Sequence, residues 1–368
     1  MAHTTLLRTL VLSLIVAGCR NDHVNERATT GTITLPKDTV QISEYIVSAH
    51  EDWDGDLWFG TIGQGVARWD PSALLVVGGQ QLQYFATADG LIDDVVTGIA
   101  EDASGQLWFG TQAGVTRYNS GVASGVKAAT FTSYGPSEGL PGAGCKVLVD
   151  RKGGVWTGTS AGVFRFANDR FVPFELPVPK FDTLTWKMTP GKVWDLFEDS
   201  QGNIWFGLDG HGALKYNGST FTRFTKRDGL CSNNVASIVE DAQGNIWFGS
   251  ITSDHPTYIA EGGVSMYDGN SFTRFPEVRG LTANDIYNIY ADRSGKIWIG
   301  AVRVGAYRWD GTSFTLFDRI DRPDLTPSFS IQAFVEDRRG RLWFGFSGGL
   351  FRFDGKGFVN VTRGGPWE

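Results

Sequence analysis

Apolar and polar positions follow one short pattern that returns along this chain roughly every 40–50 residues. Each period contains four apolar runs, for example Val235–Val239, Ile246–Gly249, Gly263–Tyr267 and Phe272–Phe275. The runs are rich in Val, Ile, Phe, Tyr and Trp and are bounded by Gly, Asp or Asn, which predicts strands joined by tight turns. No stretch after the N-terminus has the sustained period and capping residues of a helix.

The turn between the first two runs has a fixed register of aspartate, glycine and tryptophan. The aspartate stands six residues before the tryptophan, one glycine stands three residues before it, and another glycine stands two residues after it. Aspartate can accept hydrogen bonds from a turn backbone and glycine can adopt positive φ, so we assign these residues to the fold and not to a catalytic or calcium-binding array. The seven copies are Asp52–Gly60, Asp102–Gly110, Asp150–Gly158, Asp199–Gly207, Asp241–Gly249, Asp292–Gly300 and Asp337–Gly345.

Four strands in each of seven periods predict an all-β fold, a seven-bladed β-propeller of four-stranded antiparallel blades that occupies residues 38–368. An open solenoid and a sandwich are the alternatives. Seven equal units without distinct capping units favour a closed ring, which forms one domain despite its length. How the ring closes is left open, and pairing between residues near Ile33 and the last strand is one possibility.

The N-terminal residues 1–19 have the features of a secretory signal, with Arg8 followed by the apolar Leu10–Val16. The end of this segment, Ile15–Cys19, resembles the bacterial lipobox. That resemblance implies that Cys19 is the first mature residue and carries the lipid (palmitate), and that Arg20 directs the protein to the outer membrane. An ordinary signal peptide with an incidental cysteine is the alternative. Residues 20–37, polar and rich in Thr and Asn, are expected to form a flexible tether.

Composition narrows the function classes. The formal net charge is −7 and no Lys/Arg-rich run occurs, which argues against sequence-independent nucleic-acid binding. Most of the 13 tryptophans and 25 phenylalanines occupy repeat positions, so we assign them to packing between blades. Cys145 and Cys231 enter the first strands of blades 3 and 5, which are not neighbours, so two free thiols are expected and neither a disulfide nor a zinc site.

The connections divide the predicted ring into two ends. The turns between the first and second strands are all short, and so are most turns between the third and fourth strands, apart from insertions at Pro71–Gln81 and Ser120–Thr130. The remaining connections emerge at the opposite end and vary in length. We call the two ends the turn end and the loop end, and we expect binding at the loop end because function usually lies on variable loops held by a rigid scaffold. The longest loop-end connections are Glu175–Lys192, Ile251–Glu261 and Asp318–Ser328.

Two histidines, His211 and His255, fall on loop-end connections of the adjacent blades 4 and 5. They are candidate ligand-binding residues, and two solvated loop histidines are the simpler alternative. No paired-histidine metal motif, phosphate-cradling loop or Gly-x-Ser-x-Gly elbow is present, so no catalytic residue, metal or cofactor is assigned. The full set of ligand-binding candidates is Asp209, His211, Asp254, His255, Tyr258 and Arg303.

The string Val235–Gly249 closely resembles the two-component regulator propeller repeat, as does the Asp-Gly-Leu that opens several units, for example Asp228–Leu230. The resemblance implies a propeller in the cell envelope, because members of this family commonly form the periplasmic, often glycan-recognising sensor of hybrid two-component systems. Those sensors combine two propellers with a membrane span and a kinase, whereas this sequence is expected to hold one propeller without either. A looser resemblance links the repeat to the propeller of virginiamycin B lyases, whose histidine and metal arrangement cannot be mapped onto this chain.

The leading hypothesis is a monomeric, lipid-anchored envelope propeller that faces the periplasm or the cell surface. It would act as a non-catalytic binding, sensory or scaffold module for a glycan, peptide or protein ligand. The competing hypothesis is a lyase or hydrolase that uses His211 and His255 as acid/base groups or metal ligands. A third is a purely structural interaction protein that uses the insertions at Pro71–Gln81 and Ser120–Thr130.

Overall fold

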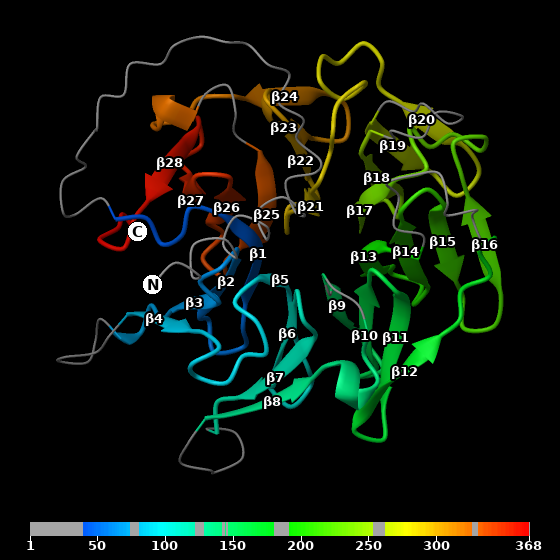
Figure 1. Cartoon of the computed structure of the whole chain (residues 1–368). Helices are drawn as coiled ribbons and strands as arrows, with labels where there is room; N and C mark the ends of the chain where they lie inside the picture. Colours follow the sequence, from blue (N-terminus) through cyan, green and yellow to red (C-terminus); the bar gives the residue numbers. More distant parts are fainter. Residues whose placement is uncertain are drawn as a thin grey trace, which may run out of the picture. The chain divides into compact units, whose positions relative to one another are not determined.

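The computed structural model describes residues 40–73, 81–121, 129–141, 144, 146–179, 191–252, 262–325 and 330–367 of the chain. Its strands form seven four-stranded antiparallel sheets, and each sheet is made from one continuous stretch of sequence. The sheets are arranged as blades around a ring, with the first strand of each blade innermost (Figure 1). The prediction of a seven-bladed propeller is therefore confirmed.

The strands follow the predicted runs closely. Blade 1 consists of β1 (Ile46–Glu51), β2 (Leu57–Thr61), β3 (Val66–Trp69) and β4 (Leu82–Phe85). Blade 2 consists of β5 (Val96–Glu101), β6 (Leu107–Thr111), β7 (Val115–Asn119) and β8 (Thr130–Tyr134). Blade 3 consists of β9 (Lys146–Val149), β10 (Val155–Thr159), β11 (Gly162–Ala167) and β12 (Arg170–Phe174). Blade 4 consists of β13 (Val193–Glu198), β14 (Ile204–Leu208), β15 (Gly212–Tyr216) and β16 (Phe221–Phe224).

The remaining three blades repeat the arrangement. Blade 5 consists of β17 (Val235–Glu240), β18 (Ile246–Ser250), β19 (Gly263–Tyr267) and β20 (Phe272–Arg274). Blade 6 consists of β21 (Ile289–Ala291), β22 (Ile297–Ala301), β23 (Gly305–Trp309) and β24 (Phe314–Phe317). Blade 7 consists of β25 (Ile331–Glu336), β26 (Leu342–Phe346), β27 (Gly349–Phe353) and β28 (Phe358–Val361). β21 is shorter than the apolar run predicts, because the backbone N–H of Ile286 donates to Ser250 of blade 5 and not to its own sheet.

The repeat aspartates are structural, as predicted, and their contacts explain the six-residue spacing. In each of the seven blades the indole N–H of the tryptophan donates to Oδ2 of the aspartate, over 2.7–2.9 Å. The other carboxylate oxygen accepts backbone N–H groups of the turn, as Asp241 does from Gln243 and Asn245. One buried carboxylate thus joins the turn to the second strand, and the tryptophan must stand where its indole reaches that carboxylate.

The glycine two residues after each tryptophan is required by the neighbouring blade. A Cβ atom on Gly207 would lie 2.6 Å from the carbonyl oxygen of Val235, and one on Gly345 would lie 2.5 Å from that of Ile46. Real Cβ atoms do not approach carbonyl oxygens so closely, so any side chain here would push two blades apart. The glycine sets the distance between blades, which the turn signal alone does not reveal.

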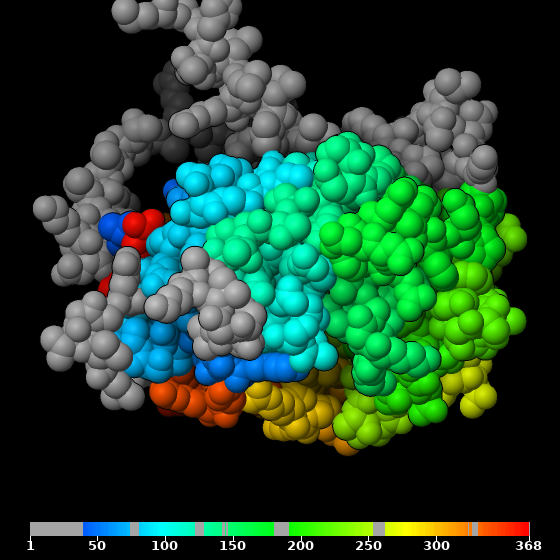
Figure 2. All heavy atoms as spheres, turned by 90° about the horizontal axis from the view of Figure 1, so that it is seen from below, coloured from blue at the N-terminus to red at the C-terminus, as the bar shows by residue number. Residues whose placement is uncertain are grey.

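Packing between blades supplies the core. The buried apolar side chains of the described residues form seven clusters, and each cluster is shared by two neighbouring blades. The repeat tryptophan projects from one blade into the next, as Trp205 packs with Ile246 and Phe248. Adjacent blades therefore lie in direct contact, as the edge-on view of the cyan and green blades shows (Figure 2).

Glutamates strengthen the joints at the turn end. In five joints of the described residues the last glutamate of an innermost strand accepts the backbone N–H of the residue after the preceding blade's aspartate. The joint that closes the ring is one of these five, since Glu51 of blade 1 accepts from Arg338 of blade 7. Val149 and Ala291 occupy the glutamate position in the other two blades.

The ring closes without a blade shared between the two ends of the chain. β1 packs against β25, and Trp343 of blade 7 lies in one cluster with Phe59 of blade 1. Beside this joint the side chains of Gln41 and Asn360 exchange two hydrogen bonds of 2.8 and 3.0 Å. The pairing suggested near Ile33 lies outside the described residues.

Replacing Asp241 with alanine removes the acceptor of the Trp247 indole N–H and of two turn N–H groups in one step. Because the indole N–H is buried, we expect a loss on the order of 3 kcal/mol in the free energy of unfolding, measured by urea denaturation. Asp268→Ala is the control, since Asp268 binds the same kind of turn N–H groups at an exposed position. Equal losses in the two variants would contradict the assigned role of the carboxylate.

Candidate functional site

The two ends of the ring differ in the structure as they do in the sequence. The turn end repeats the same Asp, Gly and Trp contacts in every blade. At the loop end, the connection between the second and third strands of a blade is bound by the chain that enters the next blade. In blade 4 the N–H of Gly212 donates to Asn233, and the N–H of Gly210 donates to the side chain of Asn234.

This contact buries two of the predicted ligand-binding residues. Asp209 and His211 keep only 8% and 2% of their exposed surface, because Asn233 and Asn234 of blade 5 cover the turn that carries them. Burial lowers the pKa of His211 to about 4, and the charge of Arg223 adds to the effect. The histidine is therefore neutral at physiological pH.

The other four candidates are distributed differently. Asp254, His255 and Tyr258 lie outside the described residues. Arg303 is exposed on the corresponding connection of blade 6, with φ at +60°, two blades further round the ring than His211. The structure thus brings Asp209 and His211 together in one turn, and the assignment of all six residues to ligand binding stays a prediction.

Sequence reasoning missed four residues at the start of the innermost strands of blades 3 and 4: Lys146, Lys192, Trp194 and Asp195. All four are half-buried. Their signal was present in the repeat register. Lys146 and Asp195 stand four residues before the repeat aspartate, where the other blades have Ser48, Gly98, Ser237, Asn288 and Ala333.

Burial shapes the ionisation of this cluster. It lowers the pKa of the Lys146 ammonium, which the charge of Asp195 counteracts, and it raises the pKa of Asp195 to about 6. It also lowers the pKa of Lys192 to about 8, where the charge of Asp209 acts in the opposite direction and that of Lys146 adds to the decrease. Lys146, Lys192, Asp195 and Asp209 are therefore close enough to influence one another.

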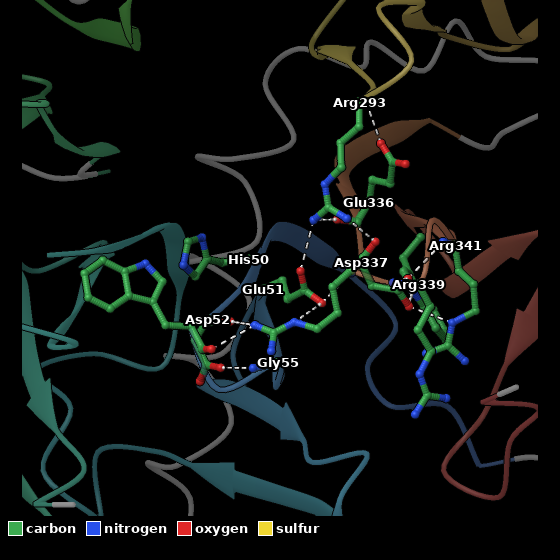
Figure 3. A network of polar contacts seen from close by, with 12 residues as sticks. His50, Glu51, Asp52, Gly55, Arg293, Glu336, Asp337, Arg339 and Arg341 are labelled. Atoms are coloured by element: carbon green, nitrogen blue, oxygen red, sulfur yellow. Dashed lines mark hydrogen bonds and ion pairs between the residues drawn. The ribbon is translucent and has the colours of Figure 1, made fainter. Parts of the chain in front are cut away.

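A pocket of about 240 Å³ lies at the turn end of the closing joint, between blades 1 and 7. Arg338 and Arg341 line it, and both contact blade 1 across the joint. Arg338 binds Glu51 and the carbonyl of Asp52 of blade 1. Arg341 binds Asp337 over 2.6 Å within blade 7 (Figure 3), and its guanidinium lies 5.5 Å from the ring centroid of Trp69 of blade 1. We therefore assign this pocket to ring closure.

The described residues contain no group of three or more His, Cys, Asp or Glu side chains that could hold a metal. No helix in the described ranges has the length and apolar character needed to cross a bilayer. The Cys231 thiol is free and buried, as predicted, whereas Cys19 and Cys145 lie outside the described residues.

The fold places the chain in the class of seven-bladed β-propellers. The family described as "two component regulator propeller" matches it at residues 90–113, 187–210, 229–252 and 280–303, in blades 2, 4, 5 and 6. Four of the seven blades thus contain a stretch that matches the repeat of this family. No curated protein matches the sequence.

Solved structures with the same fold include two extracellular domains and an enzyme. The extracellular domain of a hybrid two-component system from B. thetaiotaomicron has 22% identity and a TM-score of 0.63 over 87% of this chain and 40% of its own. A one-component system from the same organism has 16% identity and a TM-score of 0.60 over 85% and 39%. Virginiamycin B lyase from Staphylococcus aureus has 12% identity and a TM-score of 0.60 over 85% and 95%. The chain thus spans about 40% of the length of these two extracellular domains, and at these identities the likeness shows the fold alone.

The low pKa of His211 predicts a specific dependence of stability on pH. Because the folded pKa of about 4 lies below the unfolded value of 6.5, the unfolded chain binds the proton more readily. The stabilisation is present above pH 6.5 and is lost as the pH falls towards 4. Between pH 7 and pH 5 we expect wild type to lose roughly 2 kcal/mol more unfolding free energy than His211→Gln.

Urea denaturation at the two pH values measures this difference. The raised pKa of Asp195 acts in the opposite sense, giving stability at low pH that is lost as the pH rises through about 6. Both proteins retain Asp195, so its contribution cancels in the comparison. An equal pH dependence in wild type and His211→Gln would show that His211 is not held neutral by burial.

Proposed function

We propose that this protein is an extracytoplasmic propeller that binds a ligand at its loop end and performs no chemistry on it. The ligand would be a glycan, a peptide or a protein segment, and binding would serve a sensory or scaffold role. The repeats of the two-component regulator propeller family support this class of function, as do the extracellular sensor domains that share the fold.

One observation carries the proposal: the two ends of the ring use their side chains differently. At the turn end, the repeat aspartates and tryptophans bind each other within each blade. The glutamates at five joints bind the neighbouring blade. At the loop end, the innermost strands of blades 3 and 4 carry Lys146 and Asp195 where the other blades have small or neutral side chains, and blade 4 adds Lys192 and Trp194. The other blades form without such residues, and we therefore attribute these side chains to ligand binding.

The enzyme alternative has less support in the described residues. A general base works best with a pKa near the operating pH, whereas burial holds the pKa of His211 at about 4. Its partner in the lyase or hydrolase hypothesis, His255, lies outside the described residues. Virginiamycin B lyase has the same fold at 12% identity. At that identity the roles of its residues cannot be assigned to residues of this chain.

We further propose that a lipid on Cys19 anchors the propeller in the bacterial envelope, at the outer membrane, with residues 20–37 as the tether. The lipobox-like Ile15–Cys19 supports this anchor. A single acyl chain holds a protein only weakly at a membrane, whereas the multiple chains of a bacterial lipoprotein hold it firmly. The propeller would act as a monomer at the membrane surface.

Ligand binding is tested by thermal unfolding of the purified propeller against a panel of neutral and acidic oligosaccharides and peptides. We expect a binding compound to raise the midpoint of unfolding by a few degrees, and Asp254→Ala and Tyr258→Ala to reduce that shift. Gln243→Ala, an exposed change at the turn end, is the control and should respond as wild type does. A shift that survives the loop-end changes and disappears with Gln243→Ala would place binding at the wrong end of the ring.

Anchoring is tested by expressing the full chain in a Gram-negative host with radiolabelled palmitate. Wild type should incorporate the label and sediment with the outer membrane. Cys19→Ser should take up no label and be recovered in the soluble envelope fraction, while Cys231→Ser should behave as wild type does. Labelling that persists in Cys19→Ser would refute the anchor at this residue.

A further inference from the structure

The loop-end cluster of blades 3 and 4 is built on innermost strands. Lys146 is the first residue of β9, and Lys192 directly precedes β13. Trp194 is the extra residue of a β-bulge in β13, because the register with β14 shifts between Val193 and Asp195. The same register shift occurs at this position in blades 1, 2, 5 and 7, so the bulge belongs to the scaffold, and it sets the direction of the side chain that stands there. β9 and β13 lie side by side at the centre of the ring (Figure 1).

In the described residues the carboxylate of this cluster has hydrogen-bond donors, whereas the indole N–H of Trp194 has no acceptor. The Asp195 carboxylate accepts two backbone N–H groups, from Ile238 over 2.7 Å and from Leu196 over 3.0 Å. Within the part of the chain that the structure describes, the ammonium of Lys146 has no hydrogen-bond acceptor. The Lys192 ammonium lies 3.2 Å from the centroid of the Trp194 ring, and the indole N–H of Trp194 is buried without an acceptor among these residues.

Among the side-chain atoms of this cluster in the described residues, the indole N–H of Trp194 is the one that is buried without an acceptor. Such a buried donor costs roughly 1–3 kcal/mol. Lys146 and Lys192 also repel each other, since the charge of Lys146 contributes to the lowered pKa of Lys192. An acceptor that carries negative charge would relieve both costs at once.

The fold itself does not require these donors. At the position of Trp194 the other described blades have Val47, Thr97, Ala236, Tyr287 and Gln332. At the position of Lys192 they have Tyr45, Val95, Asn234, Asp285 and Ser330. Blades with these neutral or acidic side chains form the same four-stranded sheet, so the lysines and the tryptophan are additions to the scaffold.

We propose that the loop end of the ring between β9 and β13 binds a small oxyanion, whose oxygens accept hydrogen bonds from Lys146, Lys192 and the indole N–H of Trp194. This inference rests on the proposed function, because it names the ligand class for the same end of the ring. Charge-assisted hydrogen bonds from two ammonium groups favour a carboxylate, sulfate or phosphate over a neutral group of the same shape. Asp195 then acts as a positioning residue that keeps Lys146 charged.

The test uses the purified propeller and four probes at one ionic strength, balanced with chloride: sodium sulfate, sodium phosphate, glucuronate and glucose. We expect at least one oxyanion to raise the thermal midpoint of wild type by a few degrees, and glucose to have no effect. In Lys146→Met the apparent affinity for that oxyanion should fall at least tenfold. Lys356→Met, which removes one exposed lysine charge at the turn end, should keep the wild-type response.

The responses to the four probes distinguish a plain anion site from a site for an acidic sugar. They also distinguish a failure of the oxyanion site from a failure of ligand binding at the loop end. A response to sulfate or phosphate equal to that of glucuronate supports a plain anion site, and a larger response to glucuronate supports an acidic sugar. Lys146→Met also removes the cation that faces Asp195, so the anion response of each variant is read as the shift above its own midpoint without anion. If no oxyanion exceeds chloride, or if Lys146→Met responds as wild type does, the oxyanion site is wrong. Binding of a neutral glycan or peptide at the loop end would in that case leave the proposed function intact.

Discussion

The buried carboxylate of the repeat aspartate is the contact on which the ring depends. One of its oxygens gathers the N–H groups of the tight turn, and the other receives the indole N–H of the tryptophan six residues later. Both partners are otherwise buried, so neither can exchange the contact for water without a penalty. The tryptophan is thereby held in one orientation, from which it packs into the next blade and forms the core of that joint.

Ring closure follows from the same constraint. Each blade is complete in itself, so nothing distinguishes the closing joint between blades 7 and 1 from the other six in its basic design. Trp343 packs against blade 1 as Trp205 packs against blade 5, and Glu51 accepts from Arg338 as Glu240 accepts from Ser200. The chain ends add contacts around this joint, where Trp367 stacks on Trp69 with the ring centroids 4.9 Å apart. A scaffold fixed at the turn end leaves the loop end free to differ between blades.

The sequence sufficed to predict the fold, because the period, the strand runs and the turn residues all agree. It also identified the aspartates as structural, although it did not reveal their tryptophan partners or the reason for the glycine after each tryptophan. Both depend on contacts that exist only once the strands are paired and the blades are adjacent. The pairing of ring ends could not be predicted, since side chains such as Gln41 and Asn360 carry no pattern that marks them as partners.

The candidate site was predicted in part. The loop end of blade 4 was found from its unusual residues, but the burial of His211 depends on Asn233 and Asn234 of the next blade, which no local pattern shows. Lys146 and Asp195 were not predicted, because the apolar runs that identify the innermost strands do not mark single charged positions within them. A comparison of the seven blades at a single register position would have found them, since charge there is confined to two adjacent blades.

The most direct test of this account is hydrogen exchange at the tryptophan indoles, followed by NMR of protein with ¹⁵N-labelled tryptophan. The account predicts that the seven repeat indole N–H groups exchange slowly and with one common free energy, that of global unfolding, because each is bound to a buried carboxylate in one cooperative ring. Trp53, which is 62% exposed, should exchange rapidly. Repeat indoles that exchange as fast as Trp53, or that open blade by blade with separate free energies, would contradict it.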